Sequence, residues 1–192
     1  MKNGVASSAH RGLSLLEAVL TIALFLILLM LLVLLFASFT STYHFEQAYV
    51  GTSGSAGVTV TKLETLIRPA DHVLVSHAFS GGTYSSGEHT VVLEIPSIDS
   101  SGNTISSTYD YAVVYTSGTN AYSLVEVNAA SARRAGTILL TDALNSLTFT
   151  YDNGDFTQVK SVIVDVITRI TIKGKTVGDH LHEQLFLRNF SP

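Results

Sequence analysis

Glu17 is the side chain in this sequence whose position most needs a chemical explanation. It precedes an apolar run of 22 residues, Ala18 to Phe39, which contains no Asp, Glu, Lys, Arg or Pro. As a helix this run would be about 33 Å long, at roughly 1.5 Å per residue, and the hydrocarbon core of a bilayer is about 30 Å thick. A carboxylate at the edge of such a helix costs roughly a few kcal/mol unless it is paired or reaches the interface. The sequence therefore predicts a membrane-spanning helix with a glutamate at its N-terminal end, and the carboxylate of that glutamate needs a partner.

The segment that leads into this run, residues 11–17 (Arg-Gly-Leu-Ser-Leu-Leu-Glu), resembles the prepilin leader of type IV pilins and type II secretion pseudopilins. That family has a short basic leader, a glycine at the cut, an apolar first mature residue and glutamate as the fifth mature residue. Gly12 would then be the last leader residue, Leu13 the first mature residue and Glu17 the fifth. Leu13 stands where the family usually has phenylalanine or methionine. The resemblance is specific because glycine, spacing, glutamate and a long apolar run all coincide.

The resemblance implies that the chain is a structural subunit that is processed, and not an enzyme. A prepilin peptidase would cut between Gly12 and Leu13, and Leu13 would be N-methylated. The carboxylate of Glu17 would pair with the free amine of a neighbouring subunit's Leu13 during assembly. The implied partners are the peptidase, other pilin or pseudopilin subunits and membrane lipid, without a cofactor or a metal. The assembly would be a type IV pilus, a type II secretion pseudopilus or a competence apparatus.

Two other interpretations of the same residues are open. A secretory signal peptide has an apolar core of about 7–15 residues followed by a small-x-small cleavage site. The run here is longer, and only a weak candidate site lies near Ala37. A plain single-pass anchor fits the length but gives Gly12 and Glu17 no role. Its function would be that of a membrane-anchored extracytoplasmic binding domain that does not polymerise.

Charge predicts the orientation and excludes one class of partner. Lys2 and Arg11 precede the apolar run, whereas residues 40–61 contain no Lys or Arg. Because basic residues keep their end of a membrane helix in the cytoplasm, we expect a single-pass protein of the cytoplasmic (inner) membrane with its N-terminus inside and its C-terminal domain outside. Loss of residues 1–12 leaves nine basic and fifteen acidic side chains, so no basic surface for nucleic acid is expected. The chain has no cysteine, which excludes disulfides and thiol chemistry.

A continuation of the helix is expected after the apolar run. Gly51, Gly54 and Gly57 fall close together, and each glycine costs roughly 0.5–1 kcal/mol in a helix relative to alanine, so the helix should be bent or loosened there. Apolar residues then recur at helical spacing, at positions 60, 63, 66, 67 and 70. Pro69 disfavours helical geometry at Arg68 and should end the helix there.

Beyond Asp71 the apolar periodicity changes to two, which indicates strands at 72–78, 90–96, 109–116 and 121–128, with turns at 81–82, 100–103 and 117–120. The longest strand is expected at 162–172, with its even-numbered residues on one face. A polar link at 174–178 would lead to a final strand near 181–187, and links this short join antiparallel neighbours. The fold class is therefore α+β and pilin-like: one long N-terminal helix, membrane-spanning in its first half, packed on an antiparallel β-sheet.

The chain thus divides into a prepilin leader peptide (1–12), a transmembrane and assembly helix (13–39), a helix continuation with a Gly-rich bend (40–70) and an extracytoplasmic antiparallel β domain (71–192). The second half also resembles the J-type minor pseudopilins and related minor pilins. Its pattern runs from a helix end at 66–68 (Leu-Ile-Arg) through several strands to a closing Leu-Arg-Asn at 187–189.

Patterns for catalysis or metal binding are weak. No nucleophile elbow, phosphate-binding glycine loop or dinucleotide fingerprint occurs. His180 and His182, flanked by Asp179 and Glu183, would share one face of a strand and could hold zinc if a third ligand approached; a solvated polar face on an edge strand is the simpler interpretation. Residues 152–155 (Asp-Asn-Gly-Asp) offer oxygen ligands but lack the spacing of a calcium loop, and Asn-Gly between strands favours a hairpin turn.

Overall fold

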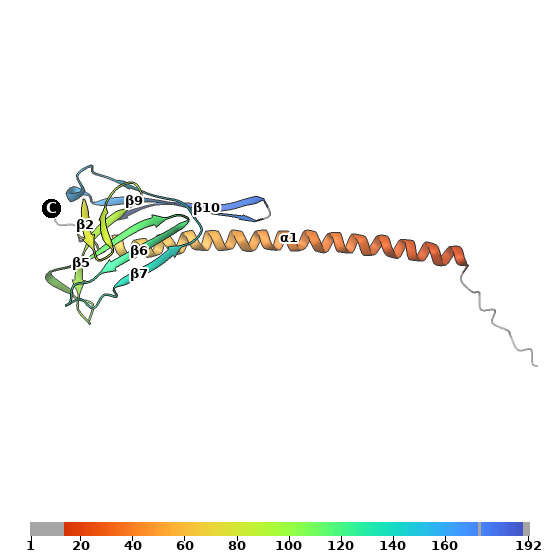
Figure 1. Cartoon of the computed structure of the whole chain (residues 1–192), viewed down its shortest axis with the longest axis horizontal. Coiled ribbons are helices and arrows are strands. Elements are labelled where there is room, and N and C mark those ends of the chain that lie inside the picture. The colour runs from red at the N-terminus through yellow and green to blue at the C-terminus, as the bar shows by residue number, and fades with distance from the viewer. Residues whose placement is uncertain (1–13, 173, 190–192) are drawn as a thin grey trace, which may run out of the picture. The chain divides into compact units, whose positions relative to one another are not determined.

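The computed structural model describes residues 14–172 and 174–189. One long helix is followed by strands and a short 3-10 helix (Figure 1). In chain order the elements are α1 (Leu15–Ile67), β1 (His72–Val73), β2 (Ser76–Phe79), β3 (Gly82–Ser85), β4 (Val91–Ile98), β5 (Thr104–Ser117), β6 (Asn120–Glu126), β7 (Gly136–Thr141), β8 (Leu144–Tyr151), η1 (Phe156–Gln158), β9 (Ser161–Ile172) and β10 (Lys175–Phe186). The α+β class expected from the sequence is confirmed.

The chain divides into two compact units, residues 1–44 and 45–192. The described part of the first unit is helical from Leu15 onward, and its large apolar side chains between Val19 and Phe39 are each between 48% and 72% exposed. Of the residues described, α1 is the one helix long and apolar enough to cross a membrane. A single-pass membrane anchor is therefore supported by length and composition.

The glycine-rich segment of α1 is helical throughout. Gly51, Gly54 and Gly57 all lie within α1, so the loosening expected there does not interrupt the helix. A Cβ atom added at any of the three would meet no heavy atom within 4 Å, so packing does not require glycine at these positions. The helix ends at Ile67, two residues before Pro69, as the restriction that proline imposes on its preceding residue predicts.

The strands of the second unit form three sheets in place of the single sheet expected. A five-stranded sheet has the order β1-β4-β5-β6-β7, a three-stranded sheet has the order β10-β9-β8, and β2 pairs with β3. Every pairing of these strands is antiparallel. The meander predicted from the short links is therefore correct, but it is divided between two larger sheets.

One hydrophobic core joins the C-terminal part of α1 to both larger sheets. Its helical members are Ala56, Val60, Leu63 and Ile67, which are 0–5% exposed and follow the helical spacing read from the sequence. Every strand of the two larger sheets contributes at least one residue to the same cluster. On β9 the even-numbered residues from Val162 to Thr168 are buried, as the alternation predicts. The core therefore forms where the sequence placed the apolar faces.

Some strand boundaries differ from those expected. Strands β3, β7 and β8 had not been predicted, and β10 begins at Lys175, so the polar link expected at 174–178 is mostly strand. Ile172 pairs with Lys175, and Gly174 has a positive φ of 78°, a conformation that glycine adopts without steric cost. The strands β8 and β9 pair as a hairpin, but residues 152–160, including η1, connect them, so Asn153 and Gly154 do not form a two-residue turn.

Candidate functional site

The start of α1 carries the residues on which the sequence interpretation depends. Gly12 and Leu13, the expected cleavage pair, lie outside the described residues. Ser14 immediately precedes α1, and its Oγ accepts a hydrogen bond from the backbone N–H of Glu17 at 3.2 Å. The carbonyl of Ser14 accepts from the N–H of Ala18 at 3.1 Å. Ser14 thus satisfies one of the N–H groups that every helix start leaves without a partner.

The carboxylate of Glu17 points to no partner within the part of the chain that the structure describes. The residue is exposed and lies in the first turn of α1, where a negative charge is favoured by the helix dipole. Its apolar neighbours Leu15 and Leu16 are 86% and 78% exposed.

Sequence reasoning missed a second feature of these residues. Ser14 and Glu17 have the Ser-x-x-Glu spacing of a capping box, in which the serine bonds the N–H at the third helical position and the glutamate reaches back to the serine N–H. The first of these two bonds is present, at 3.2 Å. The spacing itself was the signal that could have found it. This bond uses the backbone of Glu17 and not its carboxylate, so the capping role that the structure shows belongs to Ser14.

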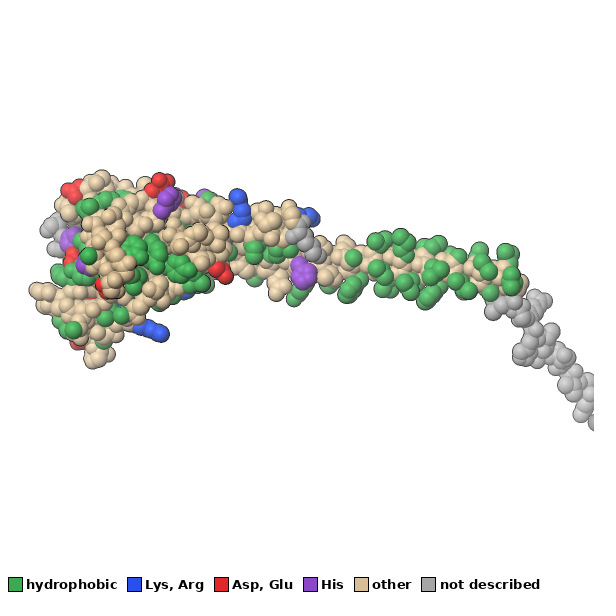
Figure 2. Space-filling model, viewed as in Figure 1, with side chains coloured by type: hydrophobic (Ala, Val, Ile, Leu, Met, Phe, Trp, Pro, Cys, Tyr) green, Lys and Arg blue, Asp and Glu red, His purple; other side chains and the backbone are tan. Residues whose placement is uncertain are grey.

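The apolar run of α1 exposes large apolar side chains at nearly consecutive positions, and therefore on every side of the helix; Figure 2 shows them on the face in view. A soluble helix would show one apolar stripe and one polar face. A helix that is apolar all round needs either lipid or other apolar helices around it. This requirement is a property of the surface itself and does not depend on any resemblance.

The two candidate metal ligands His180 and His182 contact an acid from the neighbouring strand. Nδ1 of His182 lies 2.6 Å from Oδ2 of Asp165 on β9, and Nε2 of His180 contacts Oδ1 of the same carboxylate. Hydrogen bonds from the two imidazoles hold the pKa of Asp165 below its usual value. Across the ranges 14–172 and 174–189, no group of three or more His, Cys, Asp or Glu side chains is placed to hold a metal ion. The cluster is an exposed polar network on the outer face of the hairpin.

The oxygen-rich segment 152–155 bonds to its own loop. The carboxylate of Asp152 accepts hydrogen bonds from the N–H groups of Lys160 and Ser161, both at 3.1 Å. Oδ1 of Asp155 accepts from the N–H and the hydroxyl of Thr157 at 3.0 and 2.8 Å. Because these oxygens cap backbone groups, they stabilise the connection between β8 and β9 and do not converge on a common point.

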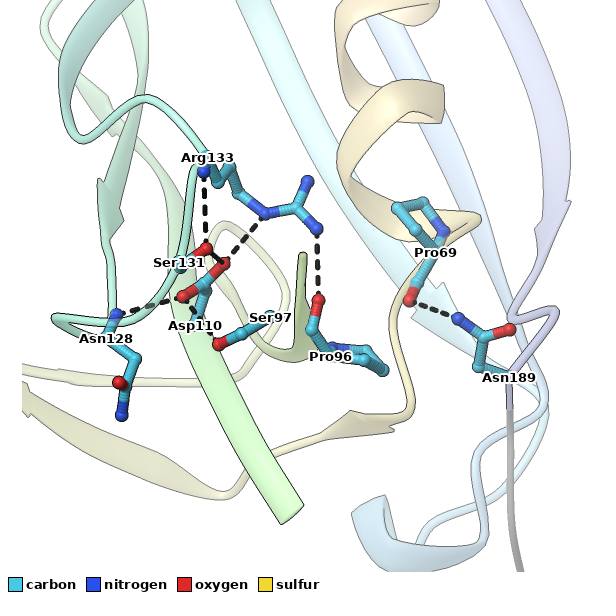
Figure 3. A network of polar contacts seen from close by, with 8 residues as sticks. All are labelled: Pro69, Pro96, Ser97, Asp110, Asn128, Ser131, Arg133 and Asn189. Carbon is cyan, nitrogen blue, oxygen red and sulfur yellow. Dashed lines mark hydrogen bonds and ion pairs between the residues drawn. The ribbon is translucent and has the colours of Figure 1, made fainter. Parts of the chain in front are cut away.

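The most buried acid of the domain is Asp110 on β5, with an exposure of 0%. Its Oδ1 accepts from the Ser97 hydroxyl and the Asn128 N–H, both at 2.9 Å. Its Oδ2 accepts from the Ser131 hydroxyl at 2.7 Å and from Nε of Arg133 at 3.0 Å (Figure 3). This network bonds the connection between β6 and β7 to the strands β4 and β5 of the five-stranded sheet.

Burial of Asp110 by itself would raise the pKa of its carboxyl. The hydrogen bonds from Ser131, Asn128, Ser97 and Arg133 outweigh burial and hold that pKa below its usual value. Arg133 also donates to the carbonyl oxygen of Pro96 at 3.1 Å. The carboxylate is therefore ionised and fully bonded, as a buried charge must be, and it serves the fold.

The end of α1 and the C-terminal segment are joined by hydrogen bonds. The N–H of Arg188 donates to the carbonyl of Arg68 at 2.9 Å, and the side-chain amide of Asn189 donates to the carbonyl of Pro69 at 2.9 Å (Figure 3). These are the two short segments, 66–68 and 187–189, that carry the softer resemblance of the second half. They lie together in space although about 120 residues separate them in the chain.

Comparison with protein-family models, with curated proteins and with solved structures gives no match for this chain.

Proposed function

We propose that this chain is a minor pilin or pseudopilin, a structural subunit that is cut by a prepilin peptidase between Gly12 and Leu13 and is then assembled into a filament. The proposal rests on the sequence at 11–17 together with one structural observation. The helix that follows is apolar on all sides and is exposed along its length from Val19 to Phe39. A filament supplies the sister helices that such a surface can pack against after it leaves the lipid.

The proposed role of Glu17 follows from electrostatics. Cleavage after Gly12 would create a positively charged amine on Leu13 at the membrane edge. In a filament that amine and the Glu17 carboxylate of a neighbour would neutralise each other, and removing one partner of a buried pair typically costs about 3–5 kcal/mol. Support for this role is the exposed position of Glu17, whose carboxylate has no partner among residues 14–172 and 174–189.

The proposed location is the cytoplasmic membrane before assembly and the filament afterwards. The excess of Lys and Arg on the N-terminal side of the apolar run supports an inside N-terminus. The domain at 45–192 would then be displayed outside the membrane. Among residues 45–172 and 174–189 we identify no catalytic arrangement, and we propose a structural role for the domain and not an enzymatic one.

One observation favours a second candidate function, a membrane-anchored extracytoplasmic domain that does not polymerise. The hydrogen bond between the Glu17 N–H and Ser14 Oγ is half of a capping box. If the Glu17 carboxylate completed the box by bonding the Ser14 N–H, the presence of glutamate at this position would need no assembly role. Chemistry separates the two: glutamine supports a capping box as glutamate does, but it cannot neutralise an amine.

The experiment that tests the proposed function is to follow incorporation of the chain into sheared filaments when it is expressed with the other subunits of its system. A subunit that assembles is recovered with the filaments, in its processed form. An anchored domain stays in the membrane fraction at every level of filament formation, and that result would contradict the proposal.

A further inference from the structure

The hairpin formed by β9 and β10 extends along α1 toward the N-terminal end of the second unit. Thr168 on β9 donates from its hydroxyl to the carbonyl of Thr52 at 3.1 Å, and the Ser53 hydroxyl donates to the carboxylate of Asp179 on β10 at 2.8 Å. Beyond these two bonds the hairpin continues for several more residue pairs, to the pair formed by Ile172 and Lys175. The two hydrogen bonds therefore hold the hairpin against α1, and its tip lies beyond them.

The tip of this hairpin lies beside an aromatic side chain of α1. The ammonium group of Lys175 lies over the ring of Phe45, 6.0 Å from its centroid. A cation in that position is attracted by the ring face. Both partners belong to the second unit, so this contact places the tip of the hairpin beside Phe45 of α1.

The chain itself then limits how far the tip can be from the membrane. Phe45 follows Phe39, the last residue of the apolar run, by only six positions. Six residues span about 9 Å as a helix and at most about 20 Å when fully extended. If the run spans a bilayer, Phe45 and the hairpin tip must lie in or close to the headgroup layer.

The side chains near the tip suit that layer. Phe45 is 39% exposed, Tyr49 is 52% exposed and Ile170 on β9 is 39% exposed, and aromatic side chains are enriched where a membrane meets water. Phe45, Tyr49 and Ile170 would be costly to expose to water on an ordinary domain surface, and an interface accommodates their apolar bodies. We call Phe45, Tyr49, Ile170 and Lys175 the interfacial collar.

The charges around the collar favour an anionic surface. Lys175 at the tip and Arg169 farther along β9 are exposed cations. Of the neighbouring acids, Asp179 is bonded to Ser53, and Glu46 on α1 is exposed. Each cation near a membrane surface strengthens attraction to anionic lipid. The collar therefore combines aromatic side chains, which suit the membrane interface, with an exposed cation, which is attracted to anionic headgroups.

We propose that the tip of the β9–β10 hairpin docks on anionic lipid headgroups of the outer surface of the membrane while the chain awaits assembly. The collar would hold the domain close to the bilayer and would release it when the helix is extracted. This inference rests on the membrane insertion contained in the proposed function, but it does not require that the chain polymerise.

The test uses the full chain in lipid nanodiscs. Because the chain has no cysteine, a Thr176→Cys variant carries a single spin label at the exposed tip. Nickel held on chelating lipid headgroups relaxes a label that lies in the headgroup layer. Labels at Ser101→Cys, in the turn between β4 and β5, and at Ile27→Cys, in the apolar run, serve as references for a domain surface and for the bilayer interior.

In nanodiscs containing phosphatidylglycerol we expect several-fold stronger relaxation at position 176 than at 101. The enhancement should fall in pure phosphatidylcholine. Lys175→Glu removes one cation and adds an anion, so it should lower the ratio of docked to free domains by more than roughly fivefold. Arg134→Glu, an exposed cation elsewhere, should leave it unchanged.

The docking proposal would be overturned by equal relaxation at positions 176 and 101, or by equal relaxation at position 176 in the two lipids. In either case a label at position 27 that reports the bilayer interior would leave the proposed function standing. A label at 27 that reports water would overturn both. Failure of the chain to enter filaments, with docking intact, would overturn the proposed function alone.

Discussion

The backbone N–H of Glu17 donates a hydrogen bond of 3.2 Å to Ser14 Oγ, so the residue proposed to drive assembly also takes part in the start of its own helix. Because this bond uses the backbone of Glu17, it is retained when the side chain is replaced, and Ser14→Ala is the variant that removes it. The charge of the carboxylate and the capping of α1 must be separated by the choice of variants.

We predict that Glu17→Gln is excluded from filaments to the same extent as Glu17→Ala, because neither glutamine nor alanine can neutralise the amine of Leu13. Ser14→Ala should weaken the helix start by about 1 kcal/mol and still assemble. The measurement is the amount of each variant in sheared filaments, relative to its amount in the membrane. Wild-type incorporation of Glu17→Gln would show that assembly does not need the charge of Glu17.

The buried carboxylate of Asp110 should be the most sensitive acid of the domain. Asp110→Asn places an amide opposite the donors of Ser131 and Arg133 and leaves Arg133 unpaired, which we expect to cost about 3–5 kcal/mol of the free energy of unfolding. Asp165→Asn is the matched control, because Asp165 also accepts two side-chain hydrogen bonds. Its partners are 58% and 59% exposed, so this variant should lose less than about 1 kcal/mol of the free energy of unfolding. Chemical denaturation of the two variants compares them, and equal losses would refute the role given to burial.

Acid should destabilise the domain through the same residue. The pKa of Asp110 is lowered in the folded state, so the stabilisation from its ionised form is fully present above the unfolded value of 3.8 and is lost as pH falls through the lower folded value. Wild type should therefore lose more of its free energy of unfolding below pH 3.8 than Asp110→Asn does. Unfolding curves at a series of pH values test this; parallel losses in the two proteins would contradict it.

Two glycines should respond to alanine in opposite directions. Gly54 lies in α1 with open space where a Cβ would be, so Gly54→Ala should stabilise the protein by about 0.5–1 kcal/mol. At Gly178 on β10 an added Cβ would collide with the backbone oxygen of Thr168, so Gly178→Ala should destabilise it. Thermal unfolding of both variants measures the difference in sign. A stabilised Gly178→Ala would show that the hairpin can shift without loss.

Elements with long periodic patterns could be read from the sequence. The helical stripe that includes Val60, Leu63 and Ile67 is buried, and the even-numbered residues of β9 face the core up to Thr168. In each case one face is apolar over several repeats, so the period alone determines what is buried.

Other parts of the fold depend on contacts that no local pattern contains. Gly178 and Asp179 interrupt the apolar alternation of β10, which hid the strand's first half although β9 pairs with it residue by residue. The contact of Asp165 with two imidazoles depends on that register. The network around Asp110 gathers residues from β4, β5 and the β6–β7 connection, and its members are separated by up to 37 positions.

The most direct test of the central claim is the intact mass and N-terminal sequence of the mature chain purified from cells that contain a prepilin peptidase. The account predicts a chain that begins at Leu13, carries one methyl group on its amine, and is found uncut in cells without the peptidase. A mature chain that retains residues 1–12, or one cut near Ala37, would contradict it.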